Sequence, residues 1–156
     1  MRENFVKIPL LQQREIEMKV IGPIVRAFAA EIGEERAFGI VRRAMQDISR
    51  QVGAEMSEKC GSGLKGISDN LIPMWSGGGE LVTEPKTSTE DELSFDVKRC
   101  AYAELYRELG FSDIGALISC DRDAAFLEGF DDSLELVRAK TIMAGDDRCD
   151  FCYRKK

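Results

Sequence analysis

The stretch 95-FDVKRCAYAELYRELG-110 decides the fold, because it changes from the pattern of a strand to the pattern of a helix. The segment before the change, residues 92–100, is rich in residues that favour strands, as is residues 80–87 upstream. The polar residues 88–91 separate the two segments, which predicts a β-hairpin. After the change, residues 101–110 predict a helix that ends at Gly110.

Upstream of this hairpin the chain predicts only helices. Gly22 and Pro23 interrupt the first pattern, which indicates one helix up to residue 21 and a second from Pro23 to Gly33. A long helix over residues 34–60 and a short one over 67–75 are expected next. The predicted inward positions of the first helix and of the long helix are Leu10, Ile16, Val20 and Ile21, then Phe38, Val41, Met45, Ile48 and Val52.

Downstream, residues 113–130 predict another helix, and residues 133–143 and 148–155 predict two strands around a tight turn at 144–147. The order is helices, hairpin, helices, hairpin. This order predicts an α+β fold in which N-terminal helices pack on an antiparallel sheet of roughly four strands, with two further helices between the hairpins. We expect a single domain over 1–156, with a helical part at 1–75 and an α+β part at 76–156.

Composition excludes several function classes. A net charge of -6 argues against nucleic-acid binding, and no apolar run is long enough to span a membrane. The opening residues show no apolar region of the kind found in signal peptides, so we expect a cytoplasmic protein with five reduced cysteines. The chain has no histidine, which excludes Ser/His/Asp and Cys/His catalytic triads.

The C-terminal pair Cys149 and Cys152 has the Cys-x-x-Cys spacing of metal clips and redox couples. On a strand, however, residues three apart point to opposite faces. Cys149 therefore shares a face with Phe151 and Tyr153, and Cys152 lies on the other face. We interpret the two cysteines as unrelated.

Two other cysteines have neighbours that bear on chemistry. Cys100 falls at the start of the helix 101–110, directly after two basic residues, and this position favours the thiolate. Cys120 lies on an apolar helix stripe, yet the charged residues of 121-DRD-123 follow it directly. An ordinary helix with one solvated face also accounts for that charge.

The segments 95-FDVKRCAYAELYRELG-110, 118-ISCDRDAAFLEGF-130 and 138-RAKTIMAGDDRCDFCY-153 resemble the L-2-amino-thiazoline-4-carboxylic acid hydrolase family. The helical segment 14-REIEMKVIGPIVRAFAAEIGEERA-37 is also similar to that family. The resemblance implies a fold like that of 4-vinyl reductase-type ligand-binding domains, and hydrolytic opening of a thiazoline to N-carbamoyl-cysteine. The family's recurring positions fall on Cys100, Cys120, Asp123, Arg138, Thr141 and Cys149.

The first hypothesis is a hydrolase that opens a cyclic amidine at a carbon–nitrogen bond. Cys100 or Cys120 would be the nucleophile, Asp123 the acid–base group with a pKa raised by burial, and Arg138 the partner of a substrate carboxylate. Thr141 would donate a hydrogen bond to the developing charge, and Cys149 would line the site. No cofactor and no metal are expected.

Two other interpretations stay open at this stage. The cysteines could line an apolar pocket of a non-catalytic module that binds a small molecule, or Cys100, Cys120 and Cys149 could together hold a metal ion without histidine. Both the hydrolase and the non-catalytic module would have a small molecule as their partner. Dimerisation through the amphipathic N-terminal helices is a further prediction.

Overall fold

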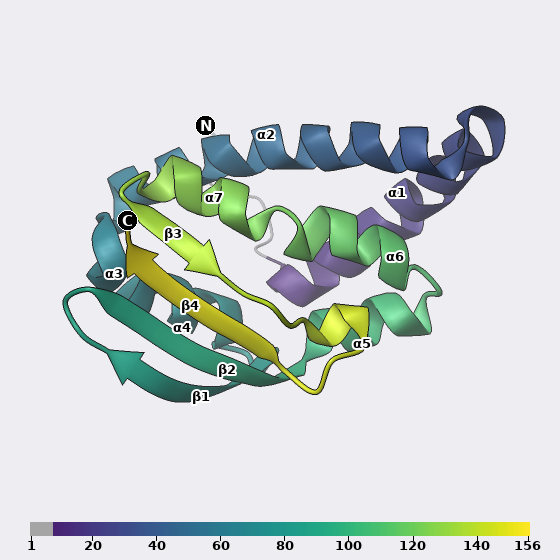
Figure 1. The fold of residues 1–156 in the computed structure, drawn as a ribbon. Coiled ribbons are helices and arrows are strands. Elements are labelled where there is room, and N and C mark those ends of the chain that lie inside the picture. The colour runs from purple at the N-terminus through teal and green to yellow at the C-terminus, as the bar shows by residue number, and fades with distance from the viewer. Residues whose placement is uncertain (1–7) are drawn as a thin grey trace.

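A computed structural model describes residues 8–156, and it confirms the predicted α+β class (Figure 1). The helices are α1 Leu10–Ile32, α2 Glu34–Cys60, α3 Gly63–Gly66, α4 Ile72–Ser76, α5 Ala101–Glu108, α6 Ser112–Gly115 and α7 Asp123–Phe130. π-helical turns at Ile67–Leu71 and Ala116–Cys120 follow α3 and α6, and a 3-10 turn covers Ile142–Ala144. The strands are β1 Leu81–Ser88, β2 Glu92–Cys100, β3 Leu134–Val137 and β4 Cys149–Lys155.

The sheet has the order β1-β2-β4-β3, and each neighbouring pair is antiparallel. One face of the sheet carries Leu93, Phe95 and Val97 of β2 together with Cys149 and Tyr153 of β4. Residues of α7 and of the π-helical turn after α3 complete this first apolar cluster. The predicted alternation of Cys149 and Tyr153 against Cys152 is confirmed, because the first two are buried in the cluster and Cys152 is only half-buried.

A second apolar cluster lies beside the first and is built from helices. It contains Met18 and Val25 of α1, Ala103 and Tyr106 of α5, and residues of the α6 region. Cys100 packs against both clusters, because it ends β2 and directly precedes α5. The switch from strand to helix at Cys100 therefore lies where the two clusters meet.

The predicted break in the first helix is wrong, since α1 runs through Pro23 without interruption. A Cβ at Gly22 would lie 2.9 Å from the ring of Phe111, so this glycine serves close packing. The predicted inner face is also partly wrong. Ile16 and Val20 are more than half exposed, because α1 packs through Met18, Gly22 and Val25.

Helix α2 has the predicted length, but its buried face is shifted. Ile48 and Val52 are exposed, whereas Ser49 and Gly53 are buried. A Cβ at Gly53 would come within 2.1 Å of the Phe126 carbonyl oxygen in α7, and Gly129 of α7 approaches α2 just as closely. The small side chains let the two backbones nearly touch, which fixes the position of α7 and of Asp123 at its start.

The second hairpin differs from the prediction. β3 is only four residues long and ends at Val137, so Arg138, Lys140 and Thr141 lie outside the strand. The tight turn is wrong as well, because residues 138–148 form a loop that includes the 3-10 turn at Ile142–Ala144. The Asp150 carboxylate of β4 accepts a hydrogen bond from the Lys140 backbone N–H at 2.6 Å. A side chain therefore accepts the bond that a backbone carbonyl would accept if β3 continued.

Helix α1 also carries a row of exposed apolar side chains at four-residue intervals. These residues form what we call the α1 ridge: Ile16, Val20, Ile24, Phe28 and Ile32. In the part of the chain that the structure describes, no helix combines the length and the apolar character needed to cross a bilayer.

Candidate functional site

A cavity of about 150 Å³ lies where the two apolar clusters meet. Its surface is mostly apolar, with Leu10, Trp75, Leu81, Val97 and Phe151 among the lining residues. An engineered apolar cavity of similar size takes up benzene, so a small ring compound is the size class that this cavity admits.

Five of the six predicted site residues line this cavity: Cys100, Cys120, Asp123, Arg138 and Cys149. Sheet topology brings three of them together. Val97 near the end of β2 pairs with Cys149 at the start of β4, and Val137 at the end of β3 pairs with Cys152. Cys100, Arg138 and Cys149 therefore meet at one end of the sheet, although up to 49 positions separate them in sequence.

Cys120 and Asp123 come to the cavity from helical segments and not from the sheet. The π-helical turn Ala116–Cys120 ends at Cys120, and α7 begins at Asp123, so the expected single helix 113–130 is divided here. Arg138, which follows β3, forms hydrogen bonds to both of these residues. Its Nη2 donates to the Cys120 carbonyl oxygen at 2.9 Å, and its Nη1 donates to Oδ2 of Asp123 at 2.5 Å.

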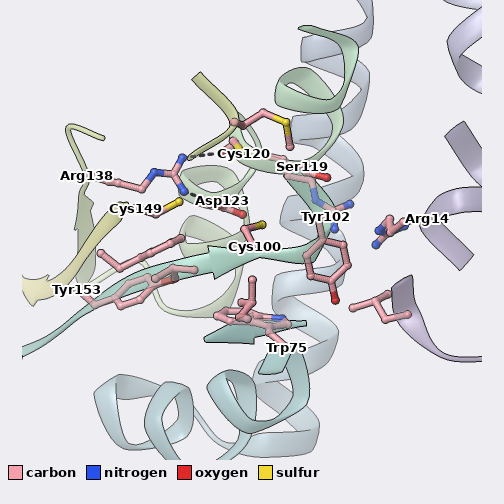
Figure 2. Close-up of a pocket in the computed structure, with 16 residues that line it drawn as sticks. Arg14, Trp75, Cys100, Tyr102, Ser119, Cys120, Asp123, Arg138, Cys149 and Tyr153 are labelled. Carbon is pink, nitrogen blue, oxygen red and sulfur yellow. Dashed lines mark hydrogen bonds and ion pairs between the residues drawn. The ribbon is translucent and has the colours of Figure 1, made fainter. Parts of the chain in front are cut away.

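The Asp123 carboxylate lies between Arg138 and Cys100 (Figure 2). Burial raises the pKa of Asp123 above the ordinary value of 3.8, and the nearby Arg138 offsets that effect only in part. One third of the side chain is still accessible, and the residue lines the cavity. A carboxylate whose pKa is raised in this way can act as an acid–base group towards a ligand in the cavity.

The three thiols have raised pKa values, which corrects the expectation that Cys100 favours the thiolate. Burial raises the pKa of Cys100, although backbone N–H groups of Ala103 and Tyr102 at the start of α5 favour its charged form. Burial also raises the pKa of Cys149, whose Sγ accepts a hydrogen bond from Ile142 N–H at 3.3 Å. Burial, with the negative charge of Asp123, raises the pKa of Cys120 to about 12. At rest, therefore, all three thiols are protonated.

Thr141 is not brought to the cavity. It precedes the 3-10 turn, where its hydroxyl accepts a hydrogen bond from Ala144 N–H at 3.2 Å and its own N–H donates to Asp146 at 2.9 Å. Its position supports a role in shaping the loop that presents Cys149.

Sequence reasoning did not select four further lining residues: Arg14, Trp75, Tyr102 and Arg122. Arg14 comes from α1, and Tyr102 comes from the first turn of α5. Figure 2 shows Arg14 and Tyr102 on the side of the cavity away from Arg138 and Cys149. The only signal in the sequence was the charge density of 121-DRD-123, which includes Arg122.

The metal interpretation finds no geometric support. Within residues 8–156, no three Cys, Asp or Glu side chains are grouped closely enough to hold a metal ion. Cys100, Cys120 and Cys149 share the cavity without forming such a group.

The sequence profile of the L-2-amino-thiazoline-4-carboxylic acid hydrolase family matches residues 13–153. The chain belongs to this family. The match includes most of α1, all of α2 and every cavity residue except Leu10, so it covers nearly the whole site. A search of curated protein sequences finds no match for this member of the hydrolase family.

Solved structures show the same fold at low sequence identity. The phenol-responsive sensory domain of the transcription activator PoxR, solved with phenol, is 12% identical, with a TM-score of 0.51 over 86% of this chain and 72% of that one. A trafficking protein particle complex subunit 3 from Naegleria fowleri, covalently bound to palmitic acid, is 14% identical, with a TM-score of 0.53 over 92% of this chain and 95% of that one. These similarities show the fold alone. Any argument for an activity must therefore come from the residues of the cavity.

Proposed function

We propose that the protein hydrolyses a small cyclic amidine of the 2-amino-thiazoline-4-carboxylate type in this cavity. The observation that carries the proposal is that Cys100, Cys120, Cys149, Asp123 and Arg138 line one cavity in a member of this family. The size of the cavity, about 150 Å³, suits a single five-membered ring with small substituents.

Atom balance identifies the bond that breaks. Conversion of 2-amino-thiazoline-4-carboxylate to N-carbamoyl-cysteine adds one water and keeps both amidine nitrogens in the carbamoyl group. The ring carbon–sulfur bond is therefore the one cleaved, which corrects the expectation of carbon–nitrogen cleavage. The reacting carbon must accept a nucleophile while the ring sulfur gains a proton.

Cys100 is the best-placed nucleophile among the three thiols. Backbone N–H groups at the start of α5 stabilise its thiolate, whereas the pKa of Cys120 rises to about 12. In the proposed reaction Asp123 removes the thiol proton of Cys100, and the sulfur bonds to the amidine carbon. The ring carbon–sulfur bond then breaks, and Asp123 returns the proton to the departing sulfur. Water next attacks the same carbon and supplies one proton to an amidine nitrogen and one to the departing sulfur, so that Cys100 leaves as the thiol and the carbamoyl product remains.

The raised pKa of Asp123 suits this double role, because such a carboxylate both accepts and returns a proton. Arg138 keeps the carboxylate in place through its hydrogen bond to Oδ2 and is itself held by Cys120 O and by the ring of Phe151, 4.9 Å from its guanidinium carbon. A substrate carboxylate would have to compete for this guanidinium with Asp123.

A second candidate function is non-catalytic binding of a small molecule. The mostly apolar cavity and the three protonated thiols favour it. The PoxR domain, which has the same fold, is a phenol-responsive sensor. On this alternative the protein binds a small ring compound and returns it unchanged.

Turnover of 2-amino-thiazoline-4-carboxylate, followed by proton NMR, separates the two functions. We expect N-carbamoyl-cysteine from the wild type, and a loss of rate of at least about 100-fold in Cys100→Ser. Cys152→Ser is the matched control, because Cys152 lies on the opposite face of β4 from Cys149 and does not line the cavity. Binding without product in the wild type would support the sensor-like alternative, and full activity in Cys100→Ser would exclude the nucleophile.

A further inference from the structure

Arg122 is a cationic side chain of the cavity that the reaction described above does not use. It is half-buried and lines the cavity directly before Asp123. Among residues 8–156 its guanidinium has no hydrogen-bond or ion-pair partner, and only its backbone carbonyl is bonded, to Ser49 and Phe126. A partly buried guanidinium without an anion is unfavourable, so its five donors are available to a ligand.

A second guanidinium reinforces the positive character of this part of the cavity. Arg14 of α1 also lines the cavity, with its side chain 16% exposed, and it shares one ion pair with Glu17. Burial lowers the pKa of Arg122, and the positive charge of Arg14 lowers it further. An anion placed beside both groups would relieve the burial cost and the repulsion together.

Tyr102 adds a neutral donor on the same side as Arg14 (Figure 2). Burial and the charge of Glu80 raise the pKa of Tyr102 to about 12, so its hydroxyl stays protonated and can donate. Arg138, by contrast, is committed to Asp123 and to the Cys120 carbonyl. The cavity thus has a carboxylate with its own arginine, with Arg14 and Tyr102 on the side away from that arginine (Figure 2), and a further lining guanidinium, that of Arg122, without a partner among residues 8–156.

We propose that Arg122, assisted by Arg14 and the Tyr102 hydroxyl, forms a subsite for the carboxylate of the substrate, and that Asp123 faces the amidine. The inference rests on the proposed function for the identity of the substrate and adds to it the residues that bind the substrate carboxylate. In this proposal Arg122, and not Arg138, binds the substrate carboxylate. Arg138 positions the carboxylate of Asp123. Bidentate binding by a guanidinium explains why an arginine suits this position.

Calorimetric titration with two pairs of ligands tests the subsite. The first pair is 2-amino-thiazoline-4-carboxylate and 2-amino-thiazoline, which lacks the carboxylate; the second is benzoate and phenol. We expect Arg122→Gln to weaken binding of both acids by about 10- to 100-fold and to leave the two ligands without a carboxylate within about 2-fold. Arg122→Lys should retain part of the affinity. Arg43→Gln, which removes an exposed charge on α2, is the matched control.

The outcomes separate this inference from the proposed function. Equal weakening of all four ligands in Arg122→Gln would show a structural role and overturn the subsite, as would unchanged affinity for the acids. If the wild type binds neither thiazoline but binds benzoate, and Arg122→Gln weakens that binding, the subsite is supported and the proposed substrate is wrong. If the wild type binds no carboxylate at all, the subsite is wrong, even if 2-amino-thiazoline binds.

Discussion

Replacing Gly53 by alanine tests the close crossing of α2 and α7. The added Cβ would lie 2.1 Å from the Phe126 carbonyl oxygen and 2.9 Å from the Phe130 nitrogen. Both atoms belong to the backbone of a helix, so no side-chain rotation relieves the contact. The helices must move apart by roughly 1 Å, because interiors are packed without spare room.

The expected cost follows from two opposing contributions. Overpacking of a tight interior costs about 1–3 kcal/mol, and contact with a rigid backbone favours the upper end. Alanine gains about 1 kcal/mol over glycine in helix propensity. Gly53→Ala should therefore lower the free energy of unfolding by about 1–2 kcal/mol.

Gly39→Ala in the same helix is the control, because the nearest atom to its added Cβ is the flexible end of Arg43 at 3.5 Å. It should gain about 0.5–1 kcal/mol of stability. Urea denaturation of both variants measures the difference, which amounts to a separation of about 0.5–3 M between the two midpoints. If Gly53→Ala were stabilised as much as Gly39→Ala, the described contact between α2 and α7 would be wrong.

Three further predictions concern the site and the surface. At pH 9 the Cys120 thiolate should be about 500-fold less abundant than that of an ordinary cysteine with pKa 9.0, so alkylation followed by peptide mass spectrometry should find this residue nearly unmodified; modification as fast as that of a free thiol would contradict the buried site. Because the folded pKa of Asp123 is raised, its contribution to stability is present at pH values below its unfolded pKa and is lost as the pH rises through the folded pKa. The stability of the wild type relative to Asp123→Asn, measured by urea unfolding, should therefore fall as the pH rises above about 4, and a rise would refute the assigned direction. We predict that the wild type forms a homodimer through the exposed α1 ridge, so Phe28→Glu should shift it towards monomer in sedimentation velocity; a monomeric wild type or an unchanged dimer would refute this interface.

The predictable part of the fold was the part in which hydrophobic pattern and burial coincide. The hairpin of β1 and β2 and the helix after Cys100 follow directly from the sequence. The first helix was misread because Gly22 is a usual breaker of helices, whereas here it makes room for the ring of Phe111. A contact between residues 89 positions apart is not visible in a local pattern.

The faces of α1 and α2 were misread for a related reason. Helix α1 carries apolar residues around much of its circumference, whereas the buried side of α2 is the one with Ser49 and Gly53, beside its apolar face. A pattern of hydrophobic residues cannot identify a face that is selected for small size. Large exposed residues such as Val20 and Ile48 then take positions that the pattern assigns to the core.

The cysteines that line the cavity were predictable from the resemblance and not from their spacing. The positions of Cys100, Cys120 and Cys149 followed from the family, and the structure brings them to one cavity. Their protonation was not predictable, because burial outweighs the favourable helix start at Cys100. Arg122 was missed since its neighbours in sequence suggested a solvated face, whereas its guanidinium lies at a cavity that only the tertiary fold creates.

The position of the cavity between two apolar clusters has a consequence for how the protein unfolds. A ligand there contacts the sheet cluster through Phe151 and the helical cluster through Met143, so it joins two parts that otherwise meet mainly around Cys100. Binding at 100 times the dissociation constant adds about 2.7 kcal/mol to the free energy of unfolding. Occupied protein should then exchange its amide hydrogens in both clusters as one cooperative unit, whereas empty protein should release those of α1 and α5 earlier than those of β2 and β4.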